Sequence, residues 1–425
     1  MGVDELKARR DQALGTGAAL FYRTPLHLVR GEGAYVFDPD GRRYVDMYNN
    51  VPCVGHANPD VVAAMTRQQA TLNVHNRYLH EGVMALAERL AGMHGPQIES
   101  VIFTCTGTEA VEVALRTARF ATGKRGIVFS NATYHGNSDL VSQLTRVGDA
   151  QPENPELRAM PFPEMYRPVE PGLSEAELAD AYLARLRGAI EHLEANGSGL
   201  AAVIFCSILA NEGLPNIPGG FMAKAAAMVR AAGGLVIADE VQAGYGRTGQ
   251  WWGYGATGFT PDIVVTGKPM GNGLPLAATA ASKALVDGFR ARTRYFNTFA
   301  SSPLQAAVGM TVLDVIERDG LVANVAKVGG ALKAALQERA PRWEAIGDVR
   351  GHGLFIGIEM VGDDRAPDAE LAAEVSNQLK ERGFLTAPAG IHRNVVKIRP
   401  PLVFSMADAD AFLGAFDATV ADLHG

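Results

Sequence analysis

The stretch that most constrains the fold of this chain, residues 234–275, contains two short apolar runs that each end in polar residues. Residues 235–238 and 263–266 have the composition of parallel strands that are covered on both faces. The first run is followed by Asp239, and the second is followed by a glycine and Lys268. Because ligands bind at the carboxyl ends of strands in open α/β sheets, we expect these two side chains to meet in a binding site.

A lysine and an acid at neighbouring strand ends suit a cofactor that needs both. Lys268 lies among apolar residues and glycines, so desolvation should lower its pKa and leave a nucleophilic amine that forms a Schiff base with an aldehyde. Pyridoxal phosphate requires such a lysine and an acidic partner, here Asp239, for its ring nitrogen. The alternative is a surface lysine and a helix-capping aspartate. The position of both residues at predicted strand ends favours the cofactor.

A phosphate site is predicted around residues 101–123. A strand pattern is followed by the polar turn Thr106-Gly107-Thr108, and apolar residues then recur at helical spacing. The free N–H groups and dipole of a helix N-terminus attract anions such as a phosphate. The alternative is an ordinary capping box, because Glu109 follows Thr106 at the required spacing, and the turn taken alone favours this cap.

The rest of the chain alternates strand and helix patterns, which predicts a mostly parallel α/β sheet. A strand at residues 126–130 is followed by Tyr134 and His135, where an aromatic side chain could stack on a cofactor ring. Residues 150–175 are rich in proline and are predicted to be irregular. Residues 244–249 match G-x-G-x-x-G, but no helix pattern follows, so we reject a dinucleotide-binding interpretation.

The predicted organisation has a large domain and a smaller α+β domain that is built from both chain ends. Residues 1–56 form the N-terminal part of the small domain, residues 57–305 the large cofactor-binding domain, and residues 306–425 the C-terminal part of the small domain. After Pro341 the pattern changes to short strands with one helix, which supports a separate C-terminal lobe.

Composition excludes several classes of function. The net charge of −7 and the absence of a basic run argue against nucleic acid as a partner. Three scattered cysteines predict neither a disulfide framework nor a metal site, and they fit a reducing cytoplasm. No apolar stretch is long enough to span a bilayer, and the first twelve residues lack the apolar core of a signal peptide. We therefore expect a cytoplasmic protein with no membrane partner.

Motifs across nearly the whole chain resemble the class III, or omega-type, aminotransferases of fold type I, which use pyridoxal phosphate. In chain order these motifs are Gly55-His56, TGTEA at 106–110, Tyr134-His135-Gly136, Asp239-Glu240-Val241-Gln242, the Lys268 loop, Thr298-Phe299 and Arg350-Gly351-His352-Gly353. The resemblance implies a pyridoxal-phosphate transferase fold with a large, mostly parallel sheet. It also implies a homodimer or a tetramer.

The resemblance also implies roles for single residues. Lys268 is expected to bind the cofactor and move the substrate proton, and Asp239 to bind the ring nitrogen. Gln242 is expected to bond the ring 3-oxygen, and Thr298 to reach the cofactor phosphate of the other subunit. The remaining cofactor contacts that it implies are Thr106, Gly107 and Thr108 at the phosphate, and Tyr134 and His135 at the ring.

Two departures from the family pattern concern the substrate. Many members carry a glutamate where this chain has Cys206, and an arginine where it has Lys397. Lysine is a point charge and lacks the two-pronged grip of arginine on a carboxylate. Lys397 and Arg399 would share one face of a strand, so both could bind one substrate anion. The alternative is that both are solvated charges on an edge strand.

Three functions follow from these observations. The first is an aminotransferase that moves an amino group from a primary amine or omega-amino acid to a keto acid. Residues 295–310, 347–360 and 394–405 most resemble the alanine–glyoxylate aminotransferase-2-like branch, which includes phospho-lyases as well as amine transaminases. The second function is therefore a phospho-lyase that eliminates phosphate and ammonia from an amino-alcohol phosphate such as ethanolamine phosphate, and it is favoured by the cationic pair and by the loss of the usual glutamate and arginine. The third, a non-catalytic sensor of the cofactor, is disfavoured by the intact Lys268 and the lack of a basic patch.

Overall fold

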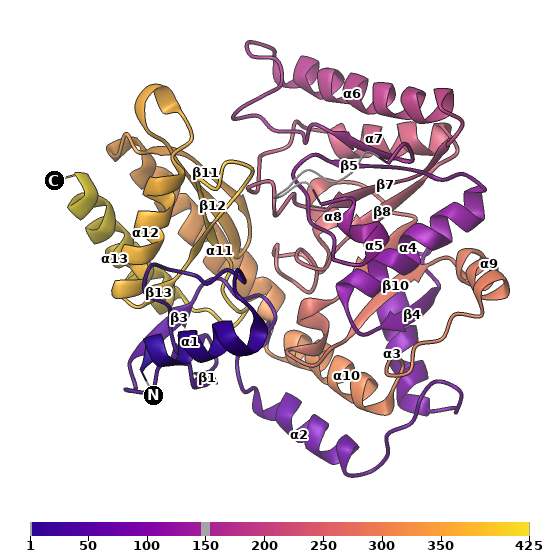
Figure 1. The fold of residues 1–425 in the computed structure, drawn as a ribbon, viewed down its shortest axis with the longest axis horizontal. Coiled ribbons are helices and arrows are strands. Elements are labelled where there is room, and N and C mark those ends of the chain that lie inside the picture. The colour runs from indigo at the N-terminus through magenta and orange to yellow at the C-terminus, as the bar shows by residue number, and fades with distance from the viewer. Residues whose placement is uncertain (1, 146–153, 425) are drawn as a thin grey trace.

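The computed structural model describes residues 2–145 and 154–424, which form two lobes (Figure 1). The larger lobe contains most of the middle of the chain, and the smaller lobe carries both termini. None of the helices in these residues is long and apolar enough to cross a bilayer. The predicted α/β class with a small domain from both chain ends is confirmed.

A seven-stranded sheet forms the centre of the large lobe. In spatial order its strands are β4 (Ser100–Thr104), β10 (Ala277–Ala281), β9 (Ile263–Thr266), β8 (Leu235–Asp239), β7 (Leu200–Cys206), β5 (Gly126–Ser130) and β6 (Leu157–Met160). The pairs from β9 to β6 are all parallel, whereas β10 runs antiparallel to both of its neighbours. The carboxyl ends of the central strands therefore share one edge.

Helices cover both faces of this sheet, which explains why its strands are continuously apolar. On one face α4 (Gly107–Thr122) and α9 (Lys283–Thr293) pack against alternate residues of β4, β5 and β7. On the other face α6 (Glu175–Ala195) and α7 (Phe221–Ala231) contact the intervening residues (Figure 1). Two short helices, α5 (Asp139–Ser142) and α8 (Gly253–Thr257), lie in the connections.

Strands from both ends of the chain build the small lobe. One sheet consists of β1 (Arg30–Glu32), β2 (Tyr35–Phe37), β3 (Arg43–Asp46) and β13 (Phe384–Leu385), which pairs with β3 in parallel. The other has the order β11 (Ile346–His352), β12 (Phe355–Met360), β15 (Val395–Ile398) and β14 (Ala387–Ala389). The helices of this lobe are α1 (Val3–Leu14), α11 (Leu321–Arg339), α12 (Ala369–Glu381) and α13 (Met406–His424).

Helices α2 (Pro59–Gln69), α3 (Glu81–Gly92) and α10 (Pro303–Arg318) pack together beside the sheet of the large lobe. Helix α2 begins after Asn58, whose side-chain oxygen accepts the N–H groups of Asp60 and Val61. Three short 3-10 helices complete the elements, η1 (Lys268–Gly271), η2 (Ala340–Arg342) and η3 (Asp363–Arg365).

The structure corrects the sequence prediction in three places. The proline-rich segment that was expected to be irregular contains β6, an edge strand of four residues that pairs with β5; residues 150–153 of that segment lie outside the described residues. The alanine-rich strand β10 was not predicted, and it is held by burial between β4 and β9. Strand β11, which contains Arg350, was also missed.

Candidate active site

Lys268 and Asp239 line one cavity of about 320 Å³ at the carboxyl ends of β8 and β9. Asp239 is the last residue of β8, and Lys268 opens η1 directly after β9 and Gly267. The two strands pair in parallel, so the topology brings their ends together as the sequence predicts. The cavity is further lined by Cys105, Thr106, Gly107, Thr108, Tyr134, His135, Cys206, Val241 and Gln242.

Lys268 has a strained backbone conformation and a lowered pKa. Its φ of 31° is left-handed, a conformation that costs a residue other than glycine about 1–3 kcal/mol. A Cβ at Gly267 would lie 3.3 Å from the Ala277 Cβ, so the chain before the lysine packs closely on the sheet. Burial, and then the nearby cation Arg399, lower the pKa of Lys268 to about 8, against an opposing effect of Asp239. A neutral, nucleophilic amine is therefore accessible near neutral pH.

His135 holds Asp239 in place. Its Nδ1 lies 2.6 Å from Asp239 Oδ2, and its Nε2 lies 3.0 Å from the Thr133 hydroxyl. With the proton on Nδ1, the imidazole donates to the carboxylate and accepts from the threonine. The other carboxylate oxygen accepts the backbone N–H of Val241 at 3.0 Å. Both oxygens are thus anchored, and the ring of His135 contacts the acid that the sequence pairs with the cofactor.

The N-terminus of α4 forms another wall of the cavity. Thr106 and Glu109 make the capping box that was weighed as the alternative: the Thr106 hydroxyl accepts the Glu109 N–H, and the Glu109 carboxylate accepts the Thr106 N–H. This cap leaves the first N–H groups of the helix without an intrahelical acceptor. The capping box and an anion site are therefore compatible, because they use different groups of the same turn.

Two glycines beside this turn leave room for a ligand, because a side chain at either position would crowd neighbouring groups. A Cβ at Gly107 would lie 3.1 Å from the Val241 side chain. Gly136 has a φ of 145°, and a Cβ there would lie 2.5 Å from the Thr108 hydroxyl oxygen, so only glycine fits. Tyr134, two residues before Gly136 in the chain, lines the cavity and is 44% exposed.

Lys397 and Arg399 lie in the interior, which makes the edge-strand alternative wrong. Strand β15 is flanked by β12 and β14, and the two residues are only 4% and 7% exposed. Lys397 Nζ lies 5.5 Å and the Arg399 guanidinium 5.0 Å from the centre of the Tyr48 ring. Within residues 2–145 and 154–424, no carboxylate forms an ion pair with either side chain.

The Arg399 side chain is held by two groups that accept hydrogen bonds. Its Nε donates to the Tyr48 carbonyl oxygen at 2.9 Å, and its Nη1 donates to Gln242 Oε1. Burial lowers the pKa of both cations; for Lys397 the neighbouring Arg399 and Lys268 add to this effect, and its pKa falls well below the ordinary value.

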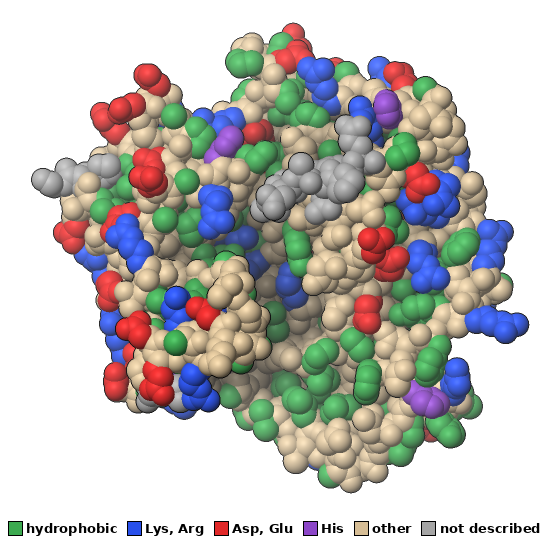
Figure 2. All heavy atoms as spheres, viewed as in Figure 1, with side chains coloured by type: hydrophobic (Ala, Val, Ile, Leu, Met, Phe, Trp, Pro, Cys, Tyr) green, Lys and Arg blue, Asp and Glu red, His purple; other side chains and the backbone are tan. Residues whose placement is uncertain are grey.

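A wider cavity of about 740 Å³ leads from the surface to Arg399. Its wall is formed by the N-terminal segment, including Phe21, whose ring contacts that of Tyr48, and by Lys268 and Arg399 at its inner end. Val51 and Lys268 line both this cavity and the smaller one. Figure 2 shows the corresponding hollow between the lobes, with Lys and Arg side chains inside it.

Thr298 does not line the cavity of Lys268. It borders a separate cavity of about 620 Å³ together with His75, Tyr78 and Phe299. Cys105, Leu274 and Pro275 line both.

Glu240, which follows Asp239 in the sequence box, and Arg247, in the glycine-rich segment 244–249, are structural. The Glu240 carboxylate accepts the N–H groups of Gly253 and Tyr254 at 2.7 and 2.8 Å, and the Ser207 hydroxyl at 2.5 Å. Burial raises the pKa of Glu240 to about 7. Arg247 is fully buried and donates to the carbonyl oxygens of Leu354 and Pro400. Glu240 therefore holds the large lobe together next to Asp239, and Arg247 links the two lobes.

Sequence reasoning missed three residues around the cavities. Tyr48 lies beneath both cations, Asn211 contacts Gln242, and Glu212 is a buried carboxyl that accepts a hydrogen bond from Ser130. No local pattern marks any of them, because each acts through residues distant in the sequence. Among the described residues, no group of three His, Cys, Asp or Glu side chains could hold a metal ion.

Comparison with known proteins accounts for this arrangement. Residues 19–420 match the family "Aminotransferase class-III". The alanine–glyoxylate aminotransferase 2-like protein of Drosophila melanogaster is 36% identical, over 96% of this chain and 85% of that protein. The ethanolamine-phosphate phospho-lyase homolog 1 of Caenorhabditis elegans is 32% identical, over 95% and 90%. The chain belongs to the class III aminotransferase family.

A solved structure extends this comparison. A phospholyase from Arthrobacter, in complex with phosphoethanolamine, is 40% identical and covers 98% of this chain and 99% of its own, with a TM-score of 0.95. Class III aminotransferases depend on pyridoxal phosphate, as the resemblance implied.

The residues of this aminotransferase fit that cofactor. The cavity combines a lysine with a lowered pKa, a carboxylate fixed by His135 and a helix N-terminus, and these three features match its aldehyde, ring nitrogen and phosphate. Gly107 and Gly136 provide the close approach that a bound group requires. Cys206 ends β7 in register with Asp239 and carries a neutral thiol, because burial raises its pKa.

Proposed function

We propose that this enzyme is an aminotransferase for small primary amines that carry an anionic group, with a keto acid as the acceptor. The observation that carries the proposal is a buried pair of cations: Arg399 lines the inner end of the wider cavity, and Lys397 lies behind it against the Tyr48 ring, which lines the same cavity. Buried cations without carboxylate partners are costly to a fold, so they mark a site where a ligand supplies the negative charge.

The proposed cofactor contacts follow the arrangement of the cavity. Asp239, held by His135, would bind the ring nitrogen, and Tyr134 would cover the ring. The N-terminus of α4 at Gly107 and Thr108 would hold the phosphate. When bound, the cofactor withdraws electrons from the carbon next to the substrate nitrogen. Lys268 would attach the cofactor and then, as a neutral amine, take the proton from that carbon.

A second function, the phospho-lyase, is favoured by the two cations acting together. A phosphate monoester carries up to two negative charges and several acceptor oxygens, which Lys397 and Arg399 could bind jointly. Elimination would break the C–H bond next to nitrogen and the C–O bond to phosphate, and hydrolysis would then release ammonia and an aldehyde. The likeness to the Arthrobacter phospholyase supports the same substrate class.

One experiment separates the two reactions. Cofactor-loaded enzyme at stoichiometric concentration is mixed with ethanolamine phosphate and, in parallel, with omega-amino acids, in the absence of a keto acid. A transaminase leaves its amino group on the cofactor and stops after one turnover. A lyase keeps releasing phosphate and ammonia beyond the amount of enzyme. Lys268→Ala should abolish both, and turnover retained in that variant would contradict the proposed chemistry.

We also propose that the enzyme is a homodimer whose partner supplies Thr298 to the cofactor phosphate; the alternative of a tetramer stays open. Leu79 and Phe299 are 97% and 74% exposed, and Phe299 borders the cavity that contains Thr298. Large apolar side chains at such exposure suit a face covered by a second copy. Leu79→Glu should yield monomers by light scattering and weaken cofactor binding; a dimer with unchanged cofactor affinity would contradict this proposal.

The remaining sequence predictions are kept as proposals. The three cysteines are free thiols, which fits a reducing compartment such as the cytoplasm. The small domain is proposed to comprise residues 1–56 and 306–425, around a large domain of residues 57–305. Limited proteolysis that cleaves first near residues 56 and 305 would support these boundaries, whereas first cleavage inside either sheet would contradict them.

A further inference from the structure

The side chain of Gln242 lies between Arg399 and Asn211, and both ends of its amide are in contact. Its Oε1 accepts a hydrogen bond from Arg399 Nη1, and its Nε2 donates to Asn211 Oδ1 at 3.3 Å. Asn211 in turn donates from Nδ2 to the backbone carbonyl oxygen of Tyr134 at 3.3 Å. Four residues from separate segments therefore form one chain of hydrogen bonds along the cofactor cavity.

The direction of this chain is fixed by its two ends. A guanidinium has only donors, so it requires the oxygen of the Gln242 amide rather than the nitrogen. A carbonyl oxygen only accepts, so Tyr134 requires the nitrogen of the Asn211 amide. The one consistent arrangement leaves Asn211 Oδ1 facing Gln242 Nε2. Reversing either amide would bring two donors or two acceptors together, and that would leave buried polar groups unpaired.

This arrangement determines what Gln242 can offer a ligand. The Nε2 group has two hydrogens, and Asn211 takes one of them. The second is available on a residue that lines the cavity. We propose that Arg399 and Asn211 are positioning residues that fix the Gln242 amide so that an N–H faces the 3-oxygen of the cofactor ring. This inference rests on the proposed contact between Gln242 and the cofactor.

Arg399 would then have two functions in one enzyme. It is one of the two cations proposed to bind the substrate anion, and it also orients the amide that binds the cofactor. Because both use the same guanidinium, an anion that draws Arg399 away from Gln242 would change the environment of the cofactor ring. Lys397 has no such link, since no hydrogen bond joins it to Gln242 within the described part of the chain.

The experiment measures the pH at which the visible absorbance of the bound cofactor changes, in holoenzyme without substrate. An N–H donor stabilises the deprotonated 3-oxygen, so losing it should raise this pH. Arg399→Met should raise it by about one unit, which is the weight of one hydrogen bond to a charged group, and Arg399→Lys should restore part of the shift. Asn211→Ala should raise it by a smaller amount while leaving every charge in the cavity unchanged.

Two controls separate orientation from charge. Lys397→Met removes a buried cation from the same pocket without touching Gln242, and it should shift the absorbance transition much less than Arg399→Met does. The second control repeats Arg399→Met and Asn211→Ala in a Gln242→Ala background, where a residue that acts through the Gln242 amide has lost its target. Both shifts should shrink to less than half. The ionisable groups around the two cavities stay in place in Asn211→Ala; those that line them are Lys268, Asp239, His135, Cys105, Cys206, Tyr134, Tyr22, Arg30, Asp46, Tyr48, His56 and Arg399, and Lys397 lies beside Arg399.

The inference is overturned if Asn211→Ala causes no shift, or if Arg399→Met causes the same shift with and without Gln242. The second outcome would mean that Arg399 acts through its charge alone. The proposed anion site is tested separately, by calorimetric binding of inorganic phosphate to the wild type and to Lys397→Met. Loss of phosphate binding with an unchanged absorbance transition would support the anion site, and a failure there leaves the test of Gln242 unaffected.

Discussion

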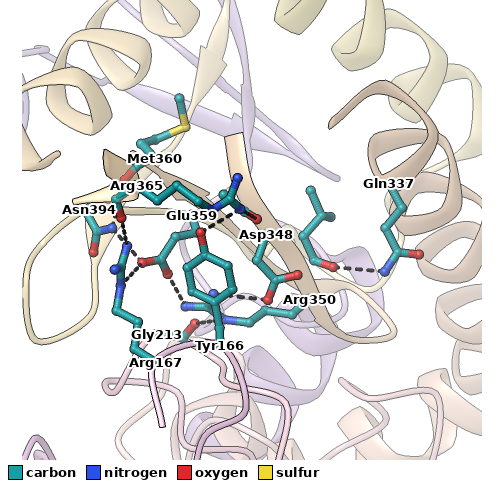
Figure 3. Close-up of polar contacts among 12 residues, drawn as sticks. Tyr166, Arg167, Gly213, Gln337, Asp348, Arg350, Glu359, Met360, Arg365 and Asn394 are labelled. Atoms are coloured by element: carbon teal, nitrogen blue, oxygen red, sulfur yellow. Dashed lines mark hydrogen bonds and ion pairs between the residues drawn. The ribbon is translucent and has the colours of Figure 1, made fainter. Parts of the chain in front are cut away.

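Two groups of cations lie on or against the same four-stranded sheet of the small lobe, and they differ in what neutralises them. Arg350 on β11 and Arg167 both contact Glu359 on β12, at 2.6 and 3.1 Å (Figure 3). Lys397 and Arg399, on and just after β15, have no ion-pair partner among the described residues.

The first group is a closed network that joins the lobes. Asn394 donates to Glu359 at 2.8 Å, and Arg350 Nε donates to the Gly213 carbonyl oxygen of the large lobe at 2.9 Å (Figure 3). Burial alone would raise the pKa of Glu359, but Arg350, Asn394 and Arg167 outweigh it, so the pKa lies below its usual value. These cations have all the partners that a structural role requires.

The difference teaches how to distinguish structural from functional charges in this fold. Both groups are desolvated, so burial and charge alone do not separate them. What separates them is the partner: Glu359 pairs with the first group, whereas Lys397 and Arg399 have no carboxylate partner among the described residues, repel each other and Lys268, and place Arg399 on a cavity wall. An unpaired cation beside a reactive lysine is costly for folding and useful for binding an anion.

The largest effect is expected from removing the carboxylate of the closed network, Glu359. Glu359→Gln keeps the shape but removes the carboxylate that Arg167 and Arg350 share, so Arg350 keeps only its ion pair with Asp348 at 3.3 Å; the substitution should lower the free energy of unfolding by about 3 kcal/mol in urea titrations. Because the folded-state pKa is lowered, the wild-type contribution is present above the unfolded pKa near 4.5 and is lost as the pH falls below it. A variant as stable as the wild type at pH 7 would contradict the structural assignment.

A second prediction sharpens the comparison at Lys268. Its pKa of about 8 means that the rate of cofactor capture by the apoenzyme should rise about tenfold per pH unit and level off near pH 8, where the amine is neutral. Arg399→Met removes one of the causes that lower this pKa, so the plateau should move to higher pH. Stopped-flow absorbance gives both profiles. Identical profiles would mean that Arg399 does not act on Lys268.

The smallest predicted effect concerns how much the buried Lys397 lowers the free energy of unfolding. Lys397→Met should raise the free energy of unfolding by about 1 kcal/mol at pH 7, because it removes a buried cation that has no partner. Since the pKa of Lys397 is lowered on folding, the gain should shrink as the pH approaches the unfolded value near 10.

Lys380 provides the matched control for this substitution. It is as buried as Lys397, but its ammonium lies 2.6 Å from a Glu381 carboxylate oxygen and donates to the Thr24 carbonyl oxygen at 3.3 Å. Lys380→Met should therefore destabilise the protein. Equal effects of the two substitutions in thermal or urea unfolding would remove the distinction between paired and unpaired cations.

Much of the fold could be predicted because its signals are local. Apolar runs such as residues 235–238 and 263–266 become the central strands, and the helical pattern after the turn at residues 106–108 becomes α4. The missed strands lack such signals: β6 is a four-residue edge strand among prolines, and β10 is mostly alanine. Burial between neighbours, rather than strand propensity, determines β10.

The residues of the candidate site also divide into those that a local sequence pattern marks and those that it does not. Asp239, Lys268 and the turn at Gly107 stand at strand ends and helix starts, which a sequence can mark. The partner of Asp239 is 104 residues away at His135, and the contact between Asn211 and Gln242 spans 31 residues. Only the strand order of the small lobe places Lys397 in the interior. Such pairings depend on tertiary packing and leave no periodic pattern in the chain.

The most direct test of the anion site compares two amines that differ only by a phosphate group. Holoenzyme is mixed with ethanolamine phosphate or with ethanolamine, and the second-order rate constant of the cofactor absorbance change is measured for the wild type, Lys397→Met and Lys380→Met. We predict that the wild type and Lys380→Met prefer the phosphate ester by about a hundredfold or more, and that Lys397→Met loses at least about tenfold of this preference. An unchanged preference in Lys397→Met would contradict the account.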